Sequence, residues 1–198
     1  IVEKFDAVFV INAARDHETM VANALKARIP VFVEKPLSLS SQSTNYLISL
    51  SKKYKTKLAC SHVFLFNNYL NNFIQCLEIN KITMIEFDWV DPLTEIRDNM
   101  EKTYDHGLPI YFDSLPHIFS ILNVILKNCE WYFQELVFLK GGSHIILSIL
   151  LGDIPCTINL KRNGNSRARC IKVKHQKLTI LDFSKEPGII KESDQKIN

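Results

Sequence analysis

The tripeptide Glu34-Lys35-Pro36 directly follows the short apolar run 29–33 and constrains the fold more than any other part of the sequence. An apolar run of this length is typical of a buried strand. Proline lacks a backbone donor and disfavours helical backbone in the residue before it, so the strand is expected to end here. An acid and a base are thereby held at a strand end. Taken alone, the tripeptide also fits an ordinary surface turn.

Strand patterns and helical patterns alternate around this tripeptide. Residues 6–11 and 57–62 are two further strand patterns, while residues 16–28 and 37–54 have the periodicity of amphipathic helices. The order strand, helix, strand, helix, strand indicates a parallel sheet covered by helices. The first part of the chain therefore predicts one mononucleotide-binding half of a doubly wound domain, with a ligand crevice at the carboxyl ends of its strands.

Three landmarks in this half-domain occur in an order that is found in a known family. The first strand is followed by a short loop and His17, the second ends in Glu34-Lys35-Pro36, and the third ends in His62, with Phe66-Asn67 after it. In this order they resemble the second half of the nucleotide-binding domain of the glucose–fructose oxidoreductase, inositol dehydrogenase and rhizopine catabolism family, usually written Gfo/Idh/MocA. Judged by motif order, the resemblance covers roughly residues 5–185.

A second motif of that family follows farther along, where Asp113 and His117 match its Asp-x-x-x-His. Two residues four apart share one face of a helix, and a carboxylate beside an imidazole suits proton transfer. The same spacing also fits a structural alternative, in which Asp113 caps a helix and Pro116 lies in its first turn.

The resemblance implies an NAD(P)-dependent oxidoreductase that transfers hydride between a nicotinamide and a hydroxyl carbon of a sugar, inositol or nucleotide sugar. It implies that His117 is the acid/base, that Lys35 is its electrostatic and hydrogen-bonding partner, and that Asp113 is a ligand of the substrate or of the histidine. We expect Lys35 and His117 to meet in one cleft between two domains, since such clefts are favoured ligand sites.

The resemblance also implies a set of residues for NAD or NADP, and it implies no metal ligands. The cofactor set is Asn12, Ala13, Ala14, His17, Glu34, Lys35 and His62. The residues alone leave other roles open for three of these. His17 also fits a helix cap, Glu34 an ion pair with Lys35, and His62 a structural histidine at a strand end.

The chain departs from the family pattern at four positions around the expected substrate site. Leu65 stands where many members have arginine, Leu108 and Pro109 follow Gly107 in place of further glycines, and Pro116 precedes the histidine. Two alternatives therefore stay open. One is a non-catalytic relative that binds a nucleotide or a partner protein, and the other is a redox-neutral, NAD-dependent glycoside hydrolase of the same family.

The sequence predicts two domains, residues 1–66 as a partial NAD(P)-binding Rossmann domain and residues 67–198 as a domain for substrate binding and oligomerisation. No Gly-x-Gly-x-x-Gly occurs among the six glycines. That turn normally opens a dinucleotide fold and binds the pyrophosphate. We therefore expect a fragment without the first Rossmann half, inactive on its own, with its first strand left as an unpaired edge.

The second domain is expected to combine helices with many strands. Helical patterns cover 67–80 and 118–126, and strand patterns cover 81–90, 144–151, 155–161, 167–174 and 178–183. Turn signals at 152–153 and 163–165 indicate hairpins, and the polar end, 185–198, is expected to fray. The fold class is therefore α/β plus α+β: the C-terminal half of a Rossmann-like parallel sheet, then an α+β domain with an open, mostly antiparallel sheet.

Composition narrows the partners and the location. A net charge of +3 is too small to indicate nucleic-acid binding. No apolar run approaches the roughly 20 residues of a membrane helix, so neither nucleic acid nor membrane is expected as a partner. Five scattered cysteines fit a reducing compartment, here the cytoplasm. The expected partners are a small sugar-type substrate and further copies of the chain, joined through the C-terminal sheet as the family resemblance implies.

Overall fold

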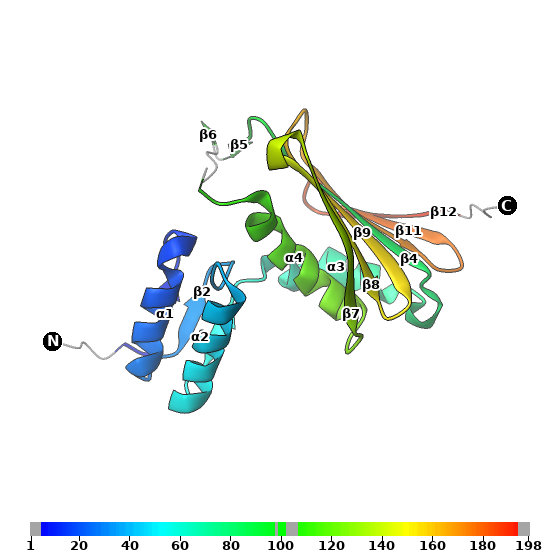
Figure 1. Cartoon of the computed structure of the whole chain (residues 1–198). Helices are drawn as coiled ribbons and strands as arrows, with labels where there is room; N and C mark the ends of the chain where they lie inside the picture. The colour runs from blue at the N-terminus through cyan, green and yellow to red at the C-terminus, as the bar shows by residue number, and fades with distance from the viewer. Residues whose placement is uncertain (1–4, 98, 102–106, 194–198) are drawn as a thin grey trace. The chain divides into compact units, whose positions relative to one another are not determined.

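The computed structural model describes residues 5–97, 99–101 and 107–193 (Figure 1). The chain divides into two compact units, Ile1–His62 and Val63–Asn198. Each unit has its own hydrophobic core. The two units are therefore described separately.

The first unit is a parallel α/β layer. Its strands are β1 (Val8–Val10), β2 (Val31–Val33) and β3 (Leu58–Cys60), and they pair in parallel in the order β1-β2-β3. Helix α1 (His17–Lys26) connects β1 to β2, and helix α2 (Ser41–Tyr54) connects β2 to β3. The three parallel strands and two helices predicted from the sequence are confirmed. In the described sheet, β1 and β3 are the two edges.

Local sequence explains where the helices of the first unit begin. The Ser40 hydroxyl caps α2 by accepting a hydrogen bond of 3.0 Å from the Ser43 backbone N–H. Asp16 occupies the corresponding position before α1 but makes no capping bond, because a short 3₁₀ turn, Ala14–Asp16, already leads into that helix. Both helices bury aliphatic side chains against the sheet, and the buried core consists of Val10, Val21, Ala22, Ala24, Leu25, Val31, Val33, Leu47 and Leu50.

The second unit is built on a seven-stranded sheet in the order β12-β11-β10-β4-β9-β8-β7. Its strands are β4 (Met84–Pro92), β7 (Trp131–Leu139), β8 (His144–Leu151), β9 (Ile154–Gly164), β10 (Ala168–Lys174), β11 (Leu178–Asp182) and β12 (Ile189–Ser193). All neighbours are antiparallel except β4 and β9. The open, mostly antiparallel sheet predicted from the sequence is confirmed. Two short strands, β5 (Ile96–Arg97) and β6 (Met100–Glu101), form a separate ladder.

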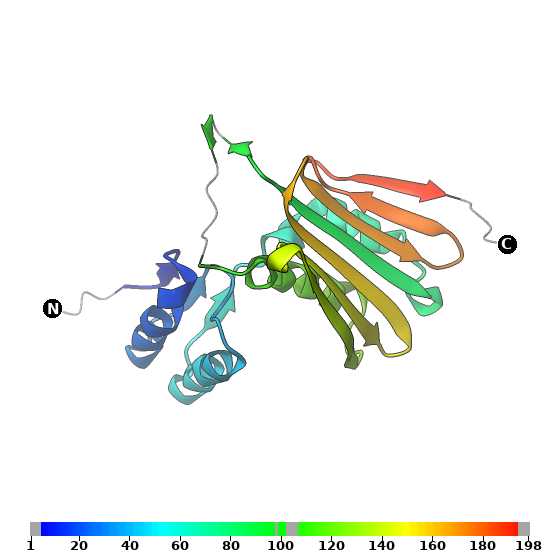
Figure 2. The same ribbon diagram turned by 45° about the horizontal axis from the view of Figure 1, so that its top comes forward.

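Helices α3 (Asn68–Gln75) and α4 (Ile110–Ile125) cover one face of this sheet, as Figure 2 shows. Burial alternates along the strands: in β8 every second residue is buried, beginning with Ile145. The buried side chains of the strands and the two helices form one apolar cluster, which includes Phe73, Phe87, Ile121, Leu122 and Ile158. The opposite face of the sheet carries a mixture of polar and apolar side chains, among them Asp88, Lys172, Ile146 and Ile180. No helix in the described ranges is long and apolar enough to span a bilayer.

A predicted hairpin at residues 163–165 is wrong. Strand β9 ends at Gly164, but β4 lies between β9 and β10 in the sheet, so the connection crosses one strand. A close approach explains the glycine, because a Cβ atom on Gly164 would collide with the side chain of Val90 on β4. The turn predicted at Gly152 does join neighbouring antiparallel strands, β8 and β9.

The predicted fraying of the polar C-terminal end is wrong for residues 189–193. These residues form β12, which pairs with β11 along its whole length. Pairing with β11 satisfies the backbone N–H and C=O groups of these residues, and a polar sequence does not predict such pairing. Residues 194–198 lie outside the described part of the chain.

Candidate functional site

Three loops of the first unit leave the same edge of its sheet. Asn12, Ala13 and Ala14 follow β1, Glu34-Lys35-Pro36 follows β2, and His62 follows β3. Since the three strands are parallel, their carboxyl ends meet at one edge, where open α/β sheets bind ligands. The sequence-predicted cofactor residues are therefore brought together at that edge.

His17 ties two of these loops to each other. Its side chain is 1% exposed, its Nδ1 lies 2.8 Å from the carbonyl oxygen of Pro36, and its Nε2 lies 3.0 Å from the carbonyl oxygen of Asn12. Carbonyl oxygens only accept hydrogen bonds, so a doubly protonated ring donates to both and a neutral ring to one. We propose that His17 positions the loops after β1 and β2, including the loop that carries Lys35.

We predict that His17→Leu loosens the first unit. The substitution removes the side chain that bonds the buried carbonyl group of Pro36 and the part-buried carbonyl group of Asn12, at a cost of about 1–3 kcal/mol in the free energy of unfolding. Amide hydrogen exchange in β1 and β2 should accelerate about tenfold or more at that cost. The control is His144→Leu on the second unit. Unchanged exchange in His17→Leu would contradict the positioning role.

The Glu34-Lys35-Pro36 turn is fixed mainly through its backbone. The Glu34 N–H donates to the carbonyl oxygen of Val10, at 2.8 Å, and extends the pairing of β1 with β2. The Lys35 N–H donates to the Glu34 carboxylate, at 3.1 Å. The bond between Lys35 and Pro36 is cis. Both charged side chains are half-buried, so each is held close to the strand ends.

His62 lies just beyond β3 with a neutral ring. Burial lowers the pKa of His62, and the nearby Glu34 carboxylate acts in the opposite direction. Its Nδ1 is buried and makes no hydrogen bond within the described residues, so it is a polar atom available to a ligand. Two residues earlier, burial raises the pKa of the Cys60 thiol to about 11, which keeps that thiol protonated and unreactive.

We predict that His62 makes the first unit less stable in acid. Its folded-state pKa lies below the value of 6.5 for a free histidine, so the unfolded chain takes up the proton first as the pH falls. Stability contributed by the neutral ring is present above pH 6.5 and declines from about pH 6.5 downward. Urea titrations followed by the NMR signals of β1–β3 measure this decline. His62→Asn should flatten it, and an unchanged slope would contradict the prediction.

In the second unit, α4 carries both residues of the Asp-x-x-x-His motif. The helix begins at Ile110 after Pro109, so Asp113 lies in its first turn and Pro116 inside it. The structural alternative, with Asp113 as the cap and Pro116 in the first turn, is therefore wrong. Asp113 and His117 lie one turn apart on the same helix face, as their spacing predicts.

His117 is packed among aromatic rings. It is 9% exposed, its ring lies 4.9 Å from that of Phe64 in an edge-to-face contact, and it stacks on Trp89 at 5.9 Å. Such packing fixes the orientation of the imidazole. The guanidinium of Arg169 lies over the Trp89 ring at 4.1 Å. The Trp89 indole therefore contacts both the Arg169 cation and the His117 imidazole.

Sequence reasoning missed the charged groups around this helix. Arg162 on β9 forms an ion pair with Asp113, with 3.5 Å between Nη2 and Oδ2, and its Nη1 donates to the carbonyl oxygen of Leu108 at 2.8 Å. Arg169 on β10 forms a buried ion pair with Asp91 on β4. Arg169 lies in the strand pattern 167–174, where the alternation predicts its burial. Arg162 lies one residue beyond the strand pattern 155–161 and has no such signal.

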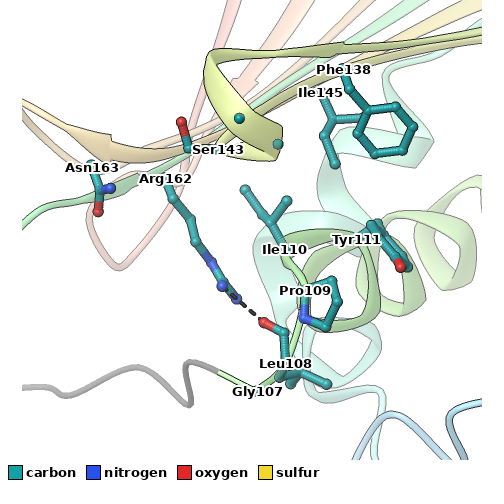
Figure 3. A pocket seen from close by; sticks show the side chains of 12 residues that line it. Gly107, Leu108, Pro109, Ile110, Tyr111, Phe138, Ser143, Ile145, Arg162 and Asn163 are labelled. Atoms are coloured by element: carbon teal, nitrogen blue, oxygen red, sulfur yellow. Dashed lines mark hydrogen bonds between the residues drawn. The ribbon is translucent and has the colours of Figure 1, made fainter.

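A pocket of about 410 Å³ opens beside Arg162, as Figure 3 shows. Its wall is formed by the segment that leads into α4 and by the turn between β7 and β8. The labelled lining residues are Gly107, Leu108, Pro109, Ile110, Tyr111, Phe138, Ser143, Ile145, Arg162 and Asn163. Three of the four departures from the family pattern lie in or near this segment. Within the described residues, no three His, Cys, Asp or Glu side chains gather as metal ligands would.

The first unit matches a known family. Residues 1–62 match the model of an oxidoreductase family with an NAD-binding Rossmann fold, GFO_IDH_MocA. The match confirms the resemblance to Gfo/Idh/MocA proteins over the first unit, and with it an NAD-binding Rossmann fold. No curated protein sequence matches the chain.

Solved structures extend the shared fold to the second unit. A 3-ketoreductase from Actinomadura kijaniata, in complex with TDP-benzene and NADP, is 14% identical with a TM-score of 0.79, over 97% of this chain and 62% of that one. A UDP-N-acetylglucosamine 3-dehydrogenase from Acidithiobacillus ferrooxidans is 15% identical with a TM-score of 0.77, over 95% and 62%.

A putative myo-inositol dehydrogenase from Sinorhizobium meliloti 1021 is 14% identical with a TM-score of 0.69, over 98% of this chain and 59% of that one. The chain thus spans less than two thirds of the length of these structures. At these identities the likeness establishes the fold.

Proposed function

We propose that the full-length protein carrying this sequence is an NAD(P)-dependent oxidoreductase that acts on a hydroxyl carbon of a sugar, inositol or nucleotide sugar. One observation carries the proposal. The three loops that follow β1, β2 and β3 lie at one sheet edge, two of them joined by His17, in the segment that matches the NAD-binding family. Two structural neighbours, the UDP-N-acetylglucosamine 3-dehydrogenase and the putative myo-inositol dehydrogenase, support the substrate class.

The residues present fit the nicotinamide side of a cofactor site. The loop of Asn12, Ala13 and Ala14 has two small side chains, which lets a flat ring approach the backbone. Glu34 supplies a carboxylate for a ribose hydroxyl, and the buried Nδ1 of His62 supplies an acceptor or donor within the same edge. A bound nicotinamide would accept the hydride when the alcohol is oxidised and supply it when the carbonyl is reduced, while the protein supplies orientation and charge.

We propose the following roles for the ionisable residues. His117 takes the proton of the substrate hydroxyl when the alcohol is oxidised and returns it when the carbonyl is reduced. Lys35 stabilises the developing negative charge on that oxygen through its ammonium group. Asp113 orients His117 or the substrate, and Arg162 holds Asp113 in place through their ion pair.

The non-catalytic alternative has one specific observation in its favour. His117 is almost fully buried against Phe64 and Trp89, as a structural histidine would be. The experiment that separates the two functions is a turnover assay of the full-length protein with NAD and NADP and a panel of sugars, inositols and nucleotide sugars. Cofactor reduction that depends on one of these substrates supports the oxidoreductase. Saturable cofactor binding without turnover of any substrate in the panel supports the non-catalytic relative.

The redox-neutral hydrolase leaves a different signature in the same assay. It would cleave a glycosidic bond with no net change in cofactor absorbance, so released sugar must be measured alongside the cofactor. Release of sugar without net reduction would replace our proposal with that alternative.

We also propose that copies of the protein associate through the second unit and that it works in the cytoplasm. The edge strand β7 exposes large apolar side chains, among them Phe133 at 67% and Phe138 at 54%, and exposed apolar strands favour association. Five free cysteines suit a reducing compartment. Light scattering of the purified protein tests the association, with a monomer as the contradicting result.

A further inference from the structure

We propose that Trp89 and Arg169 are positioning residues for His117: the indole fixes the plane of the imidazole, and the guanidinium fixes the indole. This inference rests on the proposed function, in which His117 exchanges the substrate proton, and it adds residues that act through that histidine. All of these residues belong to the second unit. We refer to His117, Trp89, Phe64 and Arg169 together as the His117 stack.

Two rings from different parts of the chain contact the His117 imidazole. Trp89 on β4 lies nearly parallel to it, at an interplanar angle of 17° and with 5.9 Å between the ring centroids. Phe64, in the short 3₁₀ turn Val63–Phe66, lies almost perpendicular to it, at 85° and 4.9 Å. Rotation of the imidazole about its Cβ–Cγ bond would therefore disrupt at least one of the two contacts.

The stack supplies an orientation that the histidine side chain does not fix by itself. The terminal torsion of a histidine is broad, so rotamer preference leaves the direction of the ring nitrogens loosely defined. Proton transfer requires a nitrogen within about 2.6–3.2 Å of the atom that carries the proton. A displacement of about 1 Å can lower the rate of such a step roughly a hundredfold. Contacts that hold the ring plane therefore contribute to the proposed proton transfer without touching the substrate.

The Trp89 indole is in turn held by Arg169. The two residues are direct neighbours across the antiparallel strands β4 and β10, and both are almost fully buried. The guanidinium carbon lies 4.1 Å from the centre of the indole ring, within the range of a cation–π contact. A further ring, Phe183, meets the indole at 5.9 Å and 73°. The indole plane is therefore fixed by a charge as well as by neighbouring rings.

Arg169 cannot move away from the indole without losing several bonds. Its guanidinium forms a buried ion pair with Asp91 and donates to the carbonyl oxygens of Val90 and Ala168. A buried ion pair often adds no net stability over apolar residues of similar size. The charge is therefore better explained by what it contacts. An aliphatic residue at this position would not reproduce the cation–π contact with Trp89.

The test is to replace Trp89 by leucine and by phenylalanine in the full-length protein, and to measure kcat and KM on a substrate found in the turnover assay. We expect Trp89→Leu to lower kcat about ten- to a hundredfold, with KM changed by no more than about threefold. Trp89→Phe keeps a ring against the imidazole and should hold kcat within about threefold of the wild type. Equal turnover of the two variants would overturn the inference, because only one of them retains the aromatic contact.

Phe73→Leu is the matched control for the loss of a buried ring. Phe73 is fully buried on α3 in the same apolar cluster but is not part of the His117 stack. Its replacement should lower the urea midpoint of unfolding as Trp89→Leu does, yet leave kcat within about twofold of the wild type in the absence of urea. A fall in kcat as large as that of Trp89→Leu would attribute the effect to general loosening of the core and overturn the inference.

A second variant carries the test if Trp89→Leu does not fold. Arg169→Met combined with Asp91→Val removes the cation together with its partner, so that no charge is left buried alone. This paired variant keeps the indole but not the contact that holds it, and we expect kcat to fall about fivefold or more. Wild-type turnover in the paired variant would remove Arg169 from the proposed arrangement and overturn the inference.

The motion of the imidazole is measured directly by ¹³C NMR relaxation of the histidine rings in the full-length protein. We expect an order parameter of about 0.85 for the His117 ring in the wild type and in Trp89→Phe, and one below about 0.6 in Trp89→Leu. His144, on the opposite face of the sheet, should give the same value in every variant. An order parameter of His117 that Trp89→Leu leaves unchanged would contradict the positioning role.

The two readouts also separate this inference from the proposed function. Ring motion is measured without cofactor or substrate, so the positioning of His117 can be established in a protein that transfers no hydride. Conversely, turnover by the wild type that Trp89→Leu leaves unchanged would keep the oxidoreductase and remove the positioning role of Trp89.

Discussion

Replacing His117 by glutamine is expected to lower turnover of the full-length enzyme by about two to four orders of magnitude, the usual contribution of general acid–base catalysis. Glutamine retains a polar amide of similar reach but cannot exchange a proton at neutral pH. Affinity for NADH or NADPH should stay unchanged, because the proposed role concerns the substrate proton. The measurement is steady-state kinetics of the variant and wild type, with cofactor binding measured on the same samples.

Two comparisons make this result specific. His144→Gln changes a half-buried histidine on the open face of the sheet, where it bonds to Asn159, and should leave turnover within about twofold. Lys35→Met combined with His117→Gln should cost less than the product of the two single effects, since residues that act in one step are not additive. Near-normal turnover of His117→Gln would eliminate the acid/base role.

Replacing Asp91 by alanine is expected to destabilise the second unit by about 3–5 kcal/mol, the cost of leaving one member of a buried ion pair alone. Arg169 is 4% exposed and Asp91 is 2% exposed. The guanidinium also donates to the carbonyl oxygens of Val90 and Ala168, at 2.6 Å and 2.8 Å, but these neutral groups do not replace the carboxylate. Burial lowers the pKa of Arg169 and the Asp91 carboxylate is the largest influence that raises it, so removal of Asp91 leaves the penalty of burial largely uncompensated.

Urea unfolding followed by tryptophan fluorescence measures this effect. The chain has two tryptophans, and Trp131→Phe leaves only Trp89, which lies under the Arg169 guanidinium. In that background, Lys127→Ala serves as the control, because it removes an exposed charge just beyond α4 and should change the free energy of unfolding by no more than about 0.5 kcal/mol. A loss for Asp91→Ala within about 0.5 kcal/mol of the control would contradict the assigned role of the buried pair.

The architecture of the first unit could be predicted because its signals are local. Apolar strands such as Val31–Val33 are bounded by proline and by charged residues, and the helices between them show a 3.6-residue period. Alternation of strand and helix then leaves a parallel sheet as the simplest solution. The order of the three motifs indicated the family. The loops that contain those motifs lie at one edge of the sheet.

The second unit was harder to predict because its organisation depends on distant pairing. Strand β7 and strand β12 were missed, the first because its apolar residues do not alternate and the second because its sequence is polar. The position of β4 between β9 and β10 has no local signature, so a turn-forming sequence at Gly164 was read as a hairpin. Local propensity does not predict which strands pair when they are far apart in the sequence.

The candidate site was likewise predicted in part from local spacing, while its distant contacts were not predicted. The spacing of Asp113 and His117 was enough to place both on one helix face. Arg162 was not found, because it follows the predicted strand 155–161 in a basic stretch that resembles the solvated face of a sheet, and the sequence does not show its contact with Leu108. His17 was identified as a cofactor or cap residue, and only the structure revealed its two backbone partners.

The central claim is that the protein binds a nicotinamide cofactor at the edge formed by the loops after β1, β2 and β3. The most direct measurement is a fluorescence titration of the full-length protein with NADH and NADPH, for wild type and for Lys35→Met. We predict saturable binding of at least one cofactor by the wild type, followed through the nicotinamide fluorescence, and a weaker affinity in the variant. Absence of saturable binding of both cofactors, or binding that is identical in the variant, would contradict the account.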